Sequence, residues 1–491
     1  MDAVRGVWFV VQPSSGLIAA PKTEQINGVS GCQFRQHRLV EAPVIGIGTE
    51  AVDQNHGVSL SRSAHDRPSD AVGVPDPDLG ARRHGLACCA GASWRANRSL
   101  ALSVSDQTAL MHEMTASTQA MAASLLSWWE AQGRVGIPWK SLPNGEPPCP
   151  DQELDPYGIW IAEVMLQQTQ LAVVLPYWQR WMTVFPTLEA LASASLEQVR
   201  LQWQGLGYYS RARRLHEAAQ LLVGQPWPRE LETWMALPGI GRTTAASILS
   251  SAFNAPLPIL DGNVKRVLAR LKAHPIPPAR DQTLFWRWSE ALLDPTRSRD
   301  FNQALMDLGA TVCLPRQPSC ERCPFQAHCA AYAAGDPSRW PMTDATKPLP
   351  FQVIGVGVVL NSAGETLIDQ RLEEGLLAGM WEFPGGKQEP GETIESCIAR
   401  ELQEELGIEV TVGEELITVD HAYSHKKLRF VVHLCDWISG DPQPLASQQV
   451  RWVRPGDLEQ YPFPAANARI IQALLGRLAG SDQAEASCDA A

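Results

Sequence analysis

The spacing of apolar residues changes once along this chain, and that change dictates a fold of at least two domains. Between residues 115 and 330, apolar positions recur at the interval of amphipathic helices, with breaks at Gly and Pro. From residue 351 onwards, short apolar runs such as FQVIGVGVVL have strand character and surround one helix, TIESCIARELQEEL. The stretch 331–350 has the composition of a linker. We therefore expect a multidomain protein with an all-α domain over 115–330 and an α+β domain over 351–475.

The two ends of the chain carry less pattern. Residues 1–113 are rich in Gly, Ser, Ala, Pro and Arg, and the first convincing amphipathic helix starts at Met121. We interpret 1–113 as a disordered leader or as the product of a mis-assigned start, and 480–491 as a loose polar tail. No apolar run reaches the roughly 18 residues of a membrane span, and the opening residues make a poor signal peptide. A cytoplasmic location is therefore expected.

Charge is divided unevenly between the two regions. The chain has a formal net charge of −12, which by itself argues against a nucleic-acid binder. Region 351–491 has a net charge of about −12, whereas 115–330 is close to neutral at about +1. Within 211–280, ten basic residues stand against four acidic ones, a net charge of about +6. The helical region thus contains a cationic zone that suits phosphate binding, because such binding depends on the local field.

Four cysteines crowd into one proline-punctuated loop at 313–329 and have the spacing C-x6-C-x2-C-x5-C: Cys313, Cys320, Cys323 and Cys329. Four thiolates can hold a [4Fe–4S] cluster or a tetrahedral zinc ion. Zinc loops more often pair two Cys-x-x-Cys knuckles, and only one such pair occurs here. The iron–sulfur cluster is therefore the favoured interpretation, followed by zinc and then by unliganded structural thiols.

A glycine-rich turn precedes a helix in LPGIGRTTAASILSSAF, and its two glycines are Gly239 and Gly241. Such a turn aims backbone N–H groups at an anion, as in helix–hairpin–helix motifs that hold DNA without reading its bases. A plain interhelical turn is the alternative. Further along, ILDGNVKRVLARL places Asp261 at a helix N-cap, a role worth about 1 kcal/mol, and Lys265 on the emerging helix.

One acidic residue, Glu163, lies within an almost wholly apolar helical run, WIAEVML. Burying an ionised carboxylate there would be costly. The side chain therefore either reaches solvent on the wet face of its helix or keeps its proton more readily than an ordinary Glu. The residues alone leave both options open.

Several long motifs occur in one order between about 120 and 330, and together they carry a family resemblance: EVMLQQTQ, GLGYYSRAR, LPGIGRTTA, ILDGNVKRVLAR, FNQALMDLGA and the four-cysteine loop. This region resembles a MutY-type adenine DNA glycosylase of the helix–hairpin–helix superfamily. The resemblance implies a [4Fe–4S] cluster in the cysteine loop and removal of adenine mispaired with 8-oxoguanine or guanine in double-stranded DNA, after the base is flipped out.

The resemblance also implies roles for single residues. Glu163 would protonate adenine N7, Asp261 would stabilise the cationic sugar, and Asn263 would orient this pair. Contacts to the duplex and the flipped base would come from Gln168, Tyr208, Gly239, Gly241, Lys265 and Gln303. Relatives that also cut the strand have a lysine in the hairpin, where this chain has Thr243, which indicates a monofunctional enzyme.

The second domain contains a full Nudix box, in which Glu401, Glu404 and Glu405 fall on one helix face and could bind Mg²⁺. It resembles MutT-type 8-oxo-dGTP hydrolases, although LASQQVRW lacks the acidic residue that those enzymes supply before the corresponding strand. It equally resembles the C-terminal domain of MutY enzymes, which recognises 8-oxoguanine. In that case the loop HAYSHKKL would contact the damaged base through Tyr423, Ser424 and His425.

The favoured hypothesis is a monomeric adenine DNA glycosylase of base excision repair whose C-terminal domain recognises 8-oxoguanine. A second Nudix pyrophosphohydrolase activity is an alternative that does not exclude the first. Weaker alternatives are an endonuclease-III-like glycosylase and a non-catalytic DNA-binding scaffold. A scaffold would have no need for acids at the positions of Glu163 and Asp261.

Overall fold

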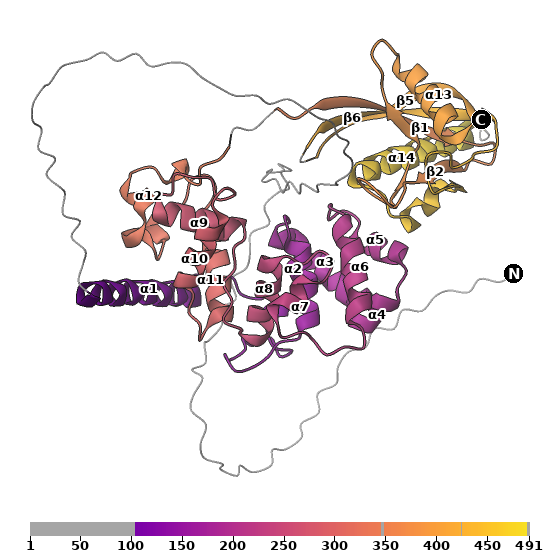
Figure 1. The fold of residues 1–491 in the computed structure, drawn as a ribbon. Helices are drawn as coiled ribbons and strands as arrows, with labels where there is room; N and C mark the ends of the chain where they lie inside the picture. Colours follow the sequence, from indigo (N-terminus) through magenta and orange to yellow (C-terminus); the bar gives the residue numbers. More distant parts are fainter. Residues whose placement is uncertain (1–103, 345–347, 424, 489–491) are drawn as a thin grey trace, which may run out of the picture. The chain divides into compact units, whose positions relative to one another are not determined.

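The computed structural model describes residues 104–344, 348–423 and 425–488 (Figure 1). The interpretation of 1–103 as a leader therefore lies outside the described residues. Helix α1 spans Val104–Gln132 and begins well before Met121, where the sequence pattern predicted the first helix. The segment 104–120 contains no Gly or Pro that would stop a helix, but its apolar residues do not recur at the spacing of an amphipathic helix, so the sequence pattern did not predict one. Residues 104–113 thus belong to a helix rather than to an irregular leader.

The region up to the linker is helical wherever it is described, as the sequence predicted. After the short 3₁₀ turn η1 (Pro138–Lys140), its α-helices are α2 (Pro156–Leu166), α3 (Leu171–Val184), α4 (Leu188–Ser193), α5 (Leu196–Trp203), α6 (Ser210–Leu222), α7 (Leu231–Met235), α8 (Arg242–Phe253), α9 (Gly262–Lys272), α10 (Gln282–Leu292), α11 (Ser298–Thr311) and α12 (Ala330–Ala333). Two 3₁₀ turns, Cys320–Arg322 and Gln326–His328, interrupt the cysteine loop.

Two hydrophobic cores support this helical domain. The first gathers fully buried tryptophans from four helices, Trp160, Trp181, Trp203 and Trp234. The second packs α1 against α9, α10 and α11. Helix α8 belongs to both, because Ala245 is buried in the first core and Ala246 in the second. The hairpin that precedes α8 is therefore anchored by both cores.

The second domain is a mixed sheet with helices on both faces. Its elements are β1 (Phe351–Leu360), β2 (Thr366–Gln370), β3 (Trp381–Glu382), β4 (Gly385–Lys387), α13 (Ile394–Leu406), β5 (Glu409–Ala422), β6 (Lys427–Ser439), β7 (Gln449–Val453) and α14 (Ala465–Cys488). The strand order is β3-β2-β1-β6-β5, with β4 paired to β1 and β7 to β2. Strands β1 and β6 run parallel and the other pairs antiparallel. This is the α+β arrangement that the sequence predicted.

Close packing places α13 directly over β1. A Cβ added at Gly355 or Gly357 would lie 2.9 Å from Ile398 Cγ1 or 3.0 Å from Leu402 Cδ1, so larger residues would push the helix away. Buried residues of α14, among them Ile470 and Leu474, belong to a separate core. Helix α14 continues to Cys488, whereas the sequence predicted a loose tail from 480; no Pro interrupts these residues.

Candidate functional site

Glu163 is the first of two acidic side chains at the candidate catalytic site, and helix α2 positions it. Asp155 caps α2 by accepting a hydrogen bond from the Tyr157 backbone N–H at 3.1 Å, and Pro156 occupies the first turn. Most residues of α2 are buried, and the Glu163 side chain is 11% exposed. Its Oε1 atom lies 3.5 Å from the Nζ atom of Lys140. The structure thus places this acid in a largely buried position beside a lysine, a neighbour that the sequence pattern had not indicated.

Asp261 is the second acid, and it caps helix α9 as the sequence predicted. Its Oδ1 accepts a hydrogen bond from the Val264 backbone N–H at 2.7 Å, and its Oδ2 accepts one from Asn263 Nδ2 at 3.2 Å. Burial raises the pKa of Asp261, and the nearby charge of Glu163 adds to that rise, while both hydrogen bonds oppose it. The two acids therefore lie close enough to influence each other.

Asn263 is itself held in place, as an orienting residue requires. Its Oδ1 accepts a hydrogen bond from Arg266 Nη2 at 2.8 Å, which leaves the amide nitrogen to face Asp261. A Cβ at Gly309 of α11 would lie 2.6 Å from the Asn263 Cβ, so α11 approaches closely here. The predicted roles of Asp261 and Asn263 thus fall on side chains that contact each other.

Gln303 is buried on α11, and its amide orientation is fixed. Its Nε2 donates to Asp307 Oδ1 at 2.7 Å, which turns the amide carbonyl oxygen the other way. Asp307 also accepts hydrogen bonds from Trp129 Nε1 at 3.0 Å and from the Arg134 backbone N–H at 2.9 Å. The Arg134 guanidinium pairs with the same carboxylate at 2.6 Å. A fixed carbonyl of this kind can accept a hydrogen bond from an exocyclic amine.

The hairpin between α7 and α8 has the geometry of an anion-binding turn. Gly239 adopts a φ of +78°, which favours glycine, and Gly241 is the N-cap of α8. Both glycines are exposed. Thr243 Oγ1 donates to the Leu260 carbonyl at 3.2 Å and so ties the hairpin to the segment that carries Asp261.

Two further predicted DNA contacts, Gln168 and Tyr208, share an unusual backbone. They are exposed non-glycine residues with φ values of +59° and +48°. The guanidinium of Arg211, which is 7% exposed, donates to carbonyls in both of their loops. Nothing in the sequence pattern had singled out Arg211. Its hydrogen bonds link the two loops that carry Gln168 and Tyr208.

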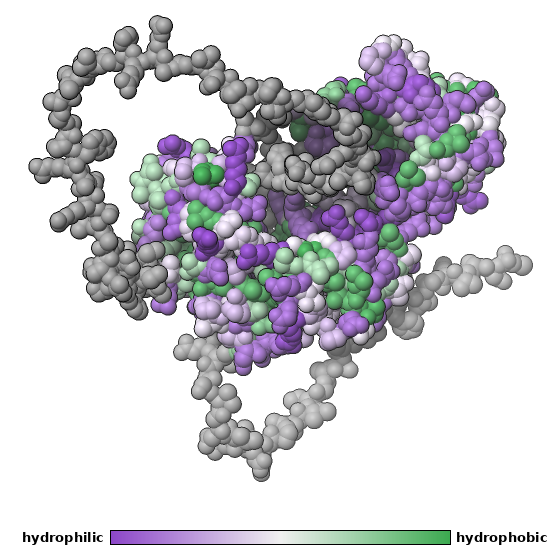
Figure 2. All heavy atoms as spheres, in the orientation of Figure 1, coloured by the Kyte–Doolittle hydropathy of each residue, from purple (hydrophilic) through white to green (hydrophobic). Residues whose placement is uncertain are grey.

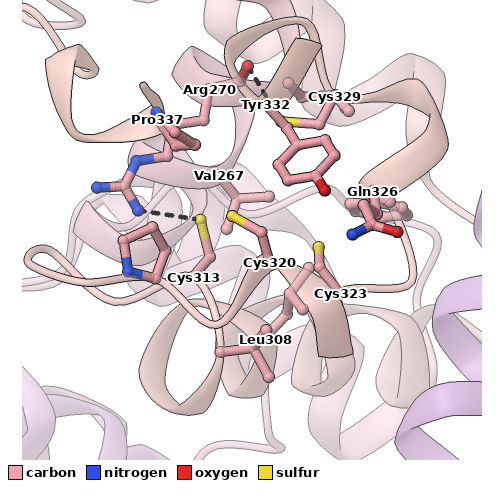
Figure 3. A pocket seen from close by; sticks show the side chains of 14 residues that line it. Val267, Arg270, Leu308, Cys313, Cys320, Cys323, Gln326, Cys329, Tyr332 and Pro337 are labelled. Atoms are coloured by element: carbon pink, nitrogen blue, oxygen red, sulfur yellow. Dashed lines mark hydrogen bonds between the residues drawn. The ribbon is translucent and has the colours of Figure 1, made fainter. Parts of the chain in front are cut away.

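The four cysteines of the loop line one cavity, together with apolar side chains such as Leu308 and Val312 (Figure 3). All four thiols are free. Burial raises the pKa of Cys323 to about 12, and it also raises the pKa values of Cys320 and Cys329. A metal charge would therefore be needed to form the thiolates.

The basic residues of α9 divide into two groups. Arg266 and Arg270 are buried and hold the cysteine loop through its backbone carbonyls. Arg270 Nη1 also donates to Cys313 Sγ at 3.3 Å. Their charge therefore does not face solvent, although the sequence count assigned it to a phosphate-binding zone. Lys265 is half-buried beside Asp261, and burial lowers its pKa.

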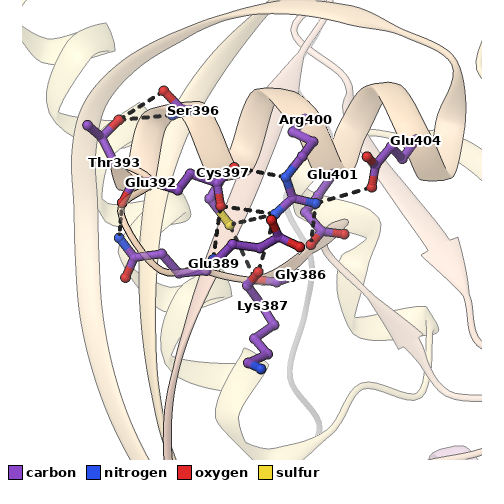
Figure 4. Close-up of polar contacts among 11 residues, drawn as sticks. Gly386, Lys387, Glu389, Glu392, Thr393, Ser396, Cys397, Arg400, Glu401 and Glu404 are labelled. Carbon is purple, nitrogen blue, oxygen red and sulfur yellow. Dashed lines mark hydrogen bonds and ion pairs between the residues drawn. The ribbon is translucent and has the colours of Figure 1, made fainter.

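In the second domain, Arg400 gathers the acids of the Nudix box (Figure 4). Its guanidinium pairs with Glu392 at 2.8 Å, with Glu401 at 2.9 Å and with Glu404 at 3.1 Å. Glu405 lies apart from this cluster, and burial together with Glu401 raises its pKa to about 7. Hydrophilic side chains cover most of the visible surface around α13 (Figure 2).

Another buried acid, Asp369 on β2, was missed by the sequence analysis. It pairs in register with Glu382 of β3, and its Oδ1 atom is buried without a hydrogen-bond partner in the structure. Burial raises its pKa well above the ordinary value, and the charges of Glu382 and Glu405 add to the rise. Asp369, Glu382 and Glu405 thus form a second group of acids near the Nudix box.

The loop between β5 and β6 carries the residues predicted to contact a damaged base. The Tyr423 backbone N–H donates to the Lys426 carbonyl at 2.8 Å, which closes a tight turn. The Tyr423 ring lies 4.6 Å from that of His421 and 6.1 Å from that of His425. Ser424 lies outside the described residues. The structure thus brings Tyr423 and His425 together at the end of the sheet.

The described ranges contain no group of three His, Cys, Asp or Glu side chains arranged to hold a single metal ion. Among the carboxylates of the Nudix box, Glu401 and Glu404 are paired with Arg400 (Figure 4). Within the same residues, no helix combines the length and the apolar character needed to cross a membrane.

Comparisons with known proteins agree with the two-domain division. Residues 161–289 match the model of the HhH-GPD superfamily base excision DNA repair proteins, and residues 355–473 match that of the NUDIX domain. The chain is 36% identical over 418 residues to a human protein named adenine DNA glycosylase, which covers 74% of this chain and 76% of the relative. A mouse protein of the same name is 36% identical over 69% of this chain and 74% of its own. A thermostable thymine-DNA glycosylase of known structure is 26% identical to this chain. The alignment covers 44% of this chain and 97% of the glycosylase, with a TM-score of 0.39.

Proposed function

The chain belongs to the adenine DNA glycosylases, and we propose from its site geometry that it removes adenine mispaired with 8-oxoguanine or guanine in double-stranded DNA. The family assignment follows from 36% identity across most of both chains, and it makes the protein a DNA N-glycosylase of base excision repair. The observation that carries the substrate proposal is the pair of neighbouring acids, Glu163 and Asp261.

Adenine is a poor leaving group, so its removal needs acid catalysis. We assign Glu163 as the donor of a proton to adenine N7 while the C1′–N9 bond breaks and its electron pair moves to the base. The sugar becomes an oxocarbenium-like cation, which a carboxylate at Asp261 would stabilise. Water then adds to C1′ and its surplus proton returns to the site. Both residues must face an extruded nucleotide, because neither reaches a base inside the stack.

The fixed amide of Gln303 supports adenine as the base. Its carbonyl oxygen would accept a hydrogen bond from the exocyclic N6 amine, while Asp307 holds the Nε2 end. A purine with a carbonyl instead of an amine at C6 would place its carbonyl oxygen against that of Gln303, and neither of these two acceptors could donate a hydrogen bond. The site would therefore reject it, because an unpaired buried polar group is costly.

The hairpin supports a monofunctional reaction. A lyase step needs an amine near C1′ to form a Schiff base, and the described hairpin offers Thr243, whose hydroxyl is bonded to the Leu260 carbonyl. Lys265 is the nearest amine to Asp261 along α9, where burial lowers its pKa. We assign it to phosphate contact rather than to covalent chemistry.

We assign a [4Fe–4S] cluster to the four-cysteine cavity. The thiols of Cys313, Cys320, Cys323 and Cys329 line one space, and Arg270 brings a positive charge to Cys313 that would offset a thiolate (Figure 3). Such a cluster would fix the loop, from which the exposed Arg316 could contact phosphates.

The C-terminal domain is proposed to recognise 8-oxoguanine opposite the adenine. Tyr423 and His425 present aromatic faces on which a base can stack, and Lys426 and Lys427 follow them for phosphate contact. Replacing both Tyr423 and His425 by Ala should lower the preference for adenine opposite 8-oxoguanine over adenine opposite guanine by about tenfold, since a stacked base is worth about 1–3 kcal/mol. An unchanged ratio of the two excision rates would reject this role.

Excision assays with the full chain test the main proposal. The substrates are duplexes that carry adenine opposite 8-oxoguanine, adenine opposite guanine, or thymine glycol. Glu163→Gln should abolish adenine release and leave duplex binding largely intact, whereas Glu232→Gln, an exposed acid on α7, should have no effect. Normal turnover by Glu163→Gln would remove the assignment, and preferred release of thymine glycol would favour the endonuclease-III-like alternative.

A second candidate activity is hydrolysis of a purine nucleoside triphosphate by the Nudix box. The specific observation is the group of Asp369, Glu382 and Glu405, whose pKa values are raised by burial, and at Asp369 and Glu405 also by the charges of neighbouring acids. A bound divalent cation would offset those charges. The test uses the Glu163→Gln chain with 8-oxo-dGTP and Mg²⁺, and the control carries Glu405→Gln in addition. If no monophosphate forms, the domain has no such activity.

A further inference from the structure

Lys140 is a buried cation beside the proposed proton donor, and no motif had singled it out. It ends the 3₁₀ turn η1, and its side chain is only 12% exposed. The Nζ atom lies 3.5 Å from Glu163 Oε1 and donates a short hydrogen bond to Ser251 Oγ of α8. Ser251 is itself buried. The ammonium is therefore fixed from two helices.

The charges around Lys140 come from several elements. Glu163 faces it from α2, and Arg299 and Asp307 act on it from α11, with opposite signs. Asp261, at the start of α9, lies near Glu163. Burial lowers the pKa of Lys140, and Glu163 is the strongest group that opposes this. The pair with Glu163 is therefore the main compensation for a cation taken out of water.

We propose that Lys140 is a positioning residue for the general acid: its ammonium, held by Ser251, aims the Glu163 carboxyl into the site. The inference rests on the proposed role of Glu163. No bond to Lys140 forms or breaks during the reaction, because Lys140 acts only through Glu163.

The direction of the effect follows from the contacts. The Lys140 ammonium lies 3.5 Å from Glu163 Oε1 and is itself held by Ser251, so it restrains the carboxyl to one orientation. Without the ammonium the carboxyl would lose this anchor, which lowers the rate of adenine excision without weakening duplex binding.

The test measures single-turnover adenine excision and duplex affinity with the full chain. Lys140→Met should lower the single-turnover rate at least about tenfold, while the Kd for the mispaired duplex stays within about twofold of that of the wild type. Lys140→Arg keeps a cation beside Glu163 and should restore most of the rate. Lys272→Met, an exposed lysine at the end of α9, is the matched control and should behave like the wild type.

Two outcomes would overturn the inference: a single-turnover rate in Lys140→Met that equals that of the wild type, or an Arg variant as impaired as the Met variant. Should Lys140→Met fail to fold, Lys140→Gln is subject to the same two criteria. If Glu163→Gln is active, the proposed function fails. If Glu163→Gln is inactive and Lys140→Met keeps the wild-type rate, the inference about Lys140 fails alone.

Discussion

Replacing Arg211 by Met should loosen the two loops that carry Gln168 and Tyr208. The Arg211 Nη1 atom donates to three carbonyls that end α2, at 3.0 Å, 2.8 Å and 2.6 Å. Its Nη2 atom donates to Thr169 Oγ1 at 3.3 Å and to the carbonyls of Leu206 and Gly207 at 3.1 Å each. One guanidinium therefore satisfies acceptors on both loops.

The magnitude follows from how much of this network is buried. A hydrogen bond to a charged group contributes about 1.5–3 kcal/mol, but contributions within one network do not add. Removing the guanidinium leaves neutral acceptors buried, and each one that stays unsatisfied costs about 1–3 kcal/mol. Arg211 is 7% exposed, and burial lowers its pKa to about 10, so this estimate needs no large discount for solvent. We expect a loss of at least about 2 kcal/mol in the free energy of unfolding of the helical domain.

The assay combines denaturant unfolding with hydrogen exchange and duplex affinity. In Arg211→Met, amide protection should fall in segments 164–169 and 206–209, and affinity for a non-cleavable mispaired duplex should drop. Arg213→Met is the control on the same helix, because the Arg213 side chain is 37% exposed and pairs with Glu217 along the surface; the substitution should cost less than about 1 kcal/mol. An Arg211→Met chain that unfolds at the wild-type denaturant concentration would refute the reasoning, as would full protection of both segments.

Three shorter predictions concern other parts of the chain. Tyr208→Ala should slow adenine excision about 10- to 100-fold, since a ring stacked on a base is worth about 1–3 kcal/mol; a single-turnover rate equal to that of the wild type would contradict the predicted contact of Tyr208 with the DNA. Cys320→Ser should lower the iron content of the purified chain and weaken duplex binding, and full iron occupancy would remove Cys320 from the ligand set. The Glu405 carboxyl should titrate near pH 7 in metal-free protein, so its contribution to stability is present below about pH 4.3 and is lost as pH rises through 7. Carbon NMR should show that midpoint, and the midpoint should move to lower pH when Mg²⁺ is added. A midpoint that Mg²⁺ does not change would exclude Glu405 as a ligand.

Apolar periodicity and short motifs were enough to predict the two fold classes, because they report local geometry. The N-cap role of Asp261 and the turn at Gly239 were predicted for the same reason. Both depend on residues within one turn of chain, where Asp and Gly have strong preferences. Helix α1 shows the converse, because its early turns have no stop residue and no clear apolar face.

Buried polar contacts were beyond the sequence, since they join segments far apart in the chain. Lys140 and Glu163 meet only when η1 packs against α2, and Arg211 meets its carbonyls only when two loops converge. A count of basic residues also cannot distinguish an exposed cation from one enclosed by carbonyls. Arg270 was counted toward a phosphate zone for that reason, yet it supports the cysteine loop.

Helix α8 is shared by both hydrophobic cores and begins at the exposed hairpin. Small side chains on α8 let neighbouring helices approach from two directions, so this helix connects the two cores. A cavity opened in either core would tilt α8 and displace the hairpin at its N-terminus. If the hairpin binds DNA phosphates as proposed, that binding depends on how well both cores are packed.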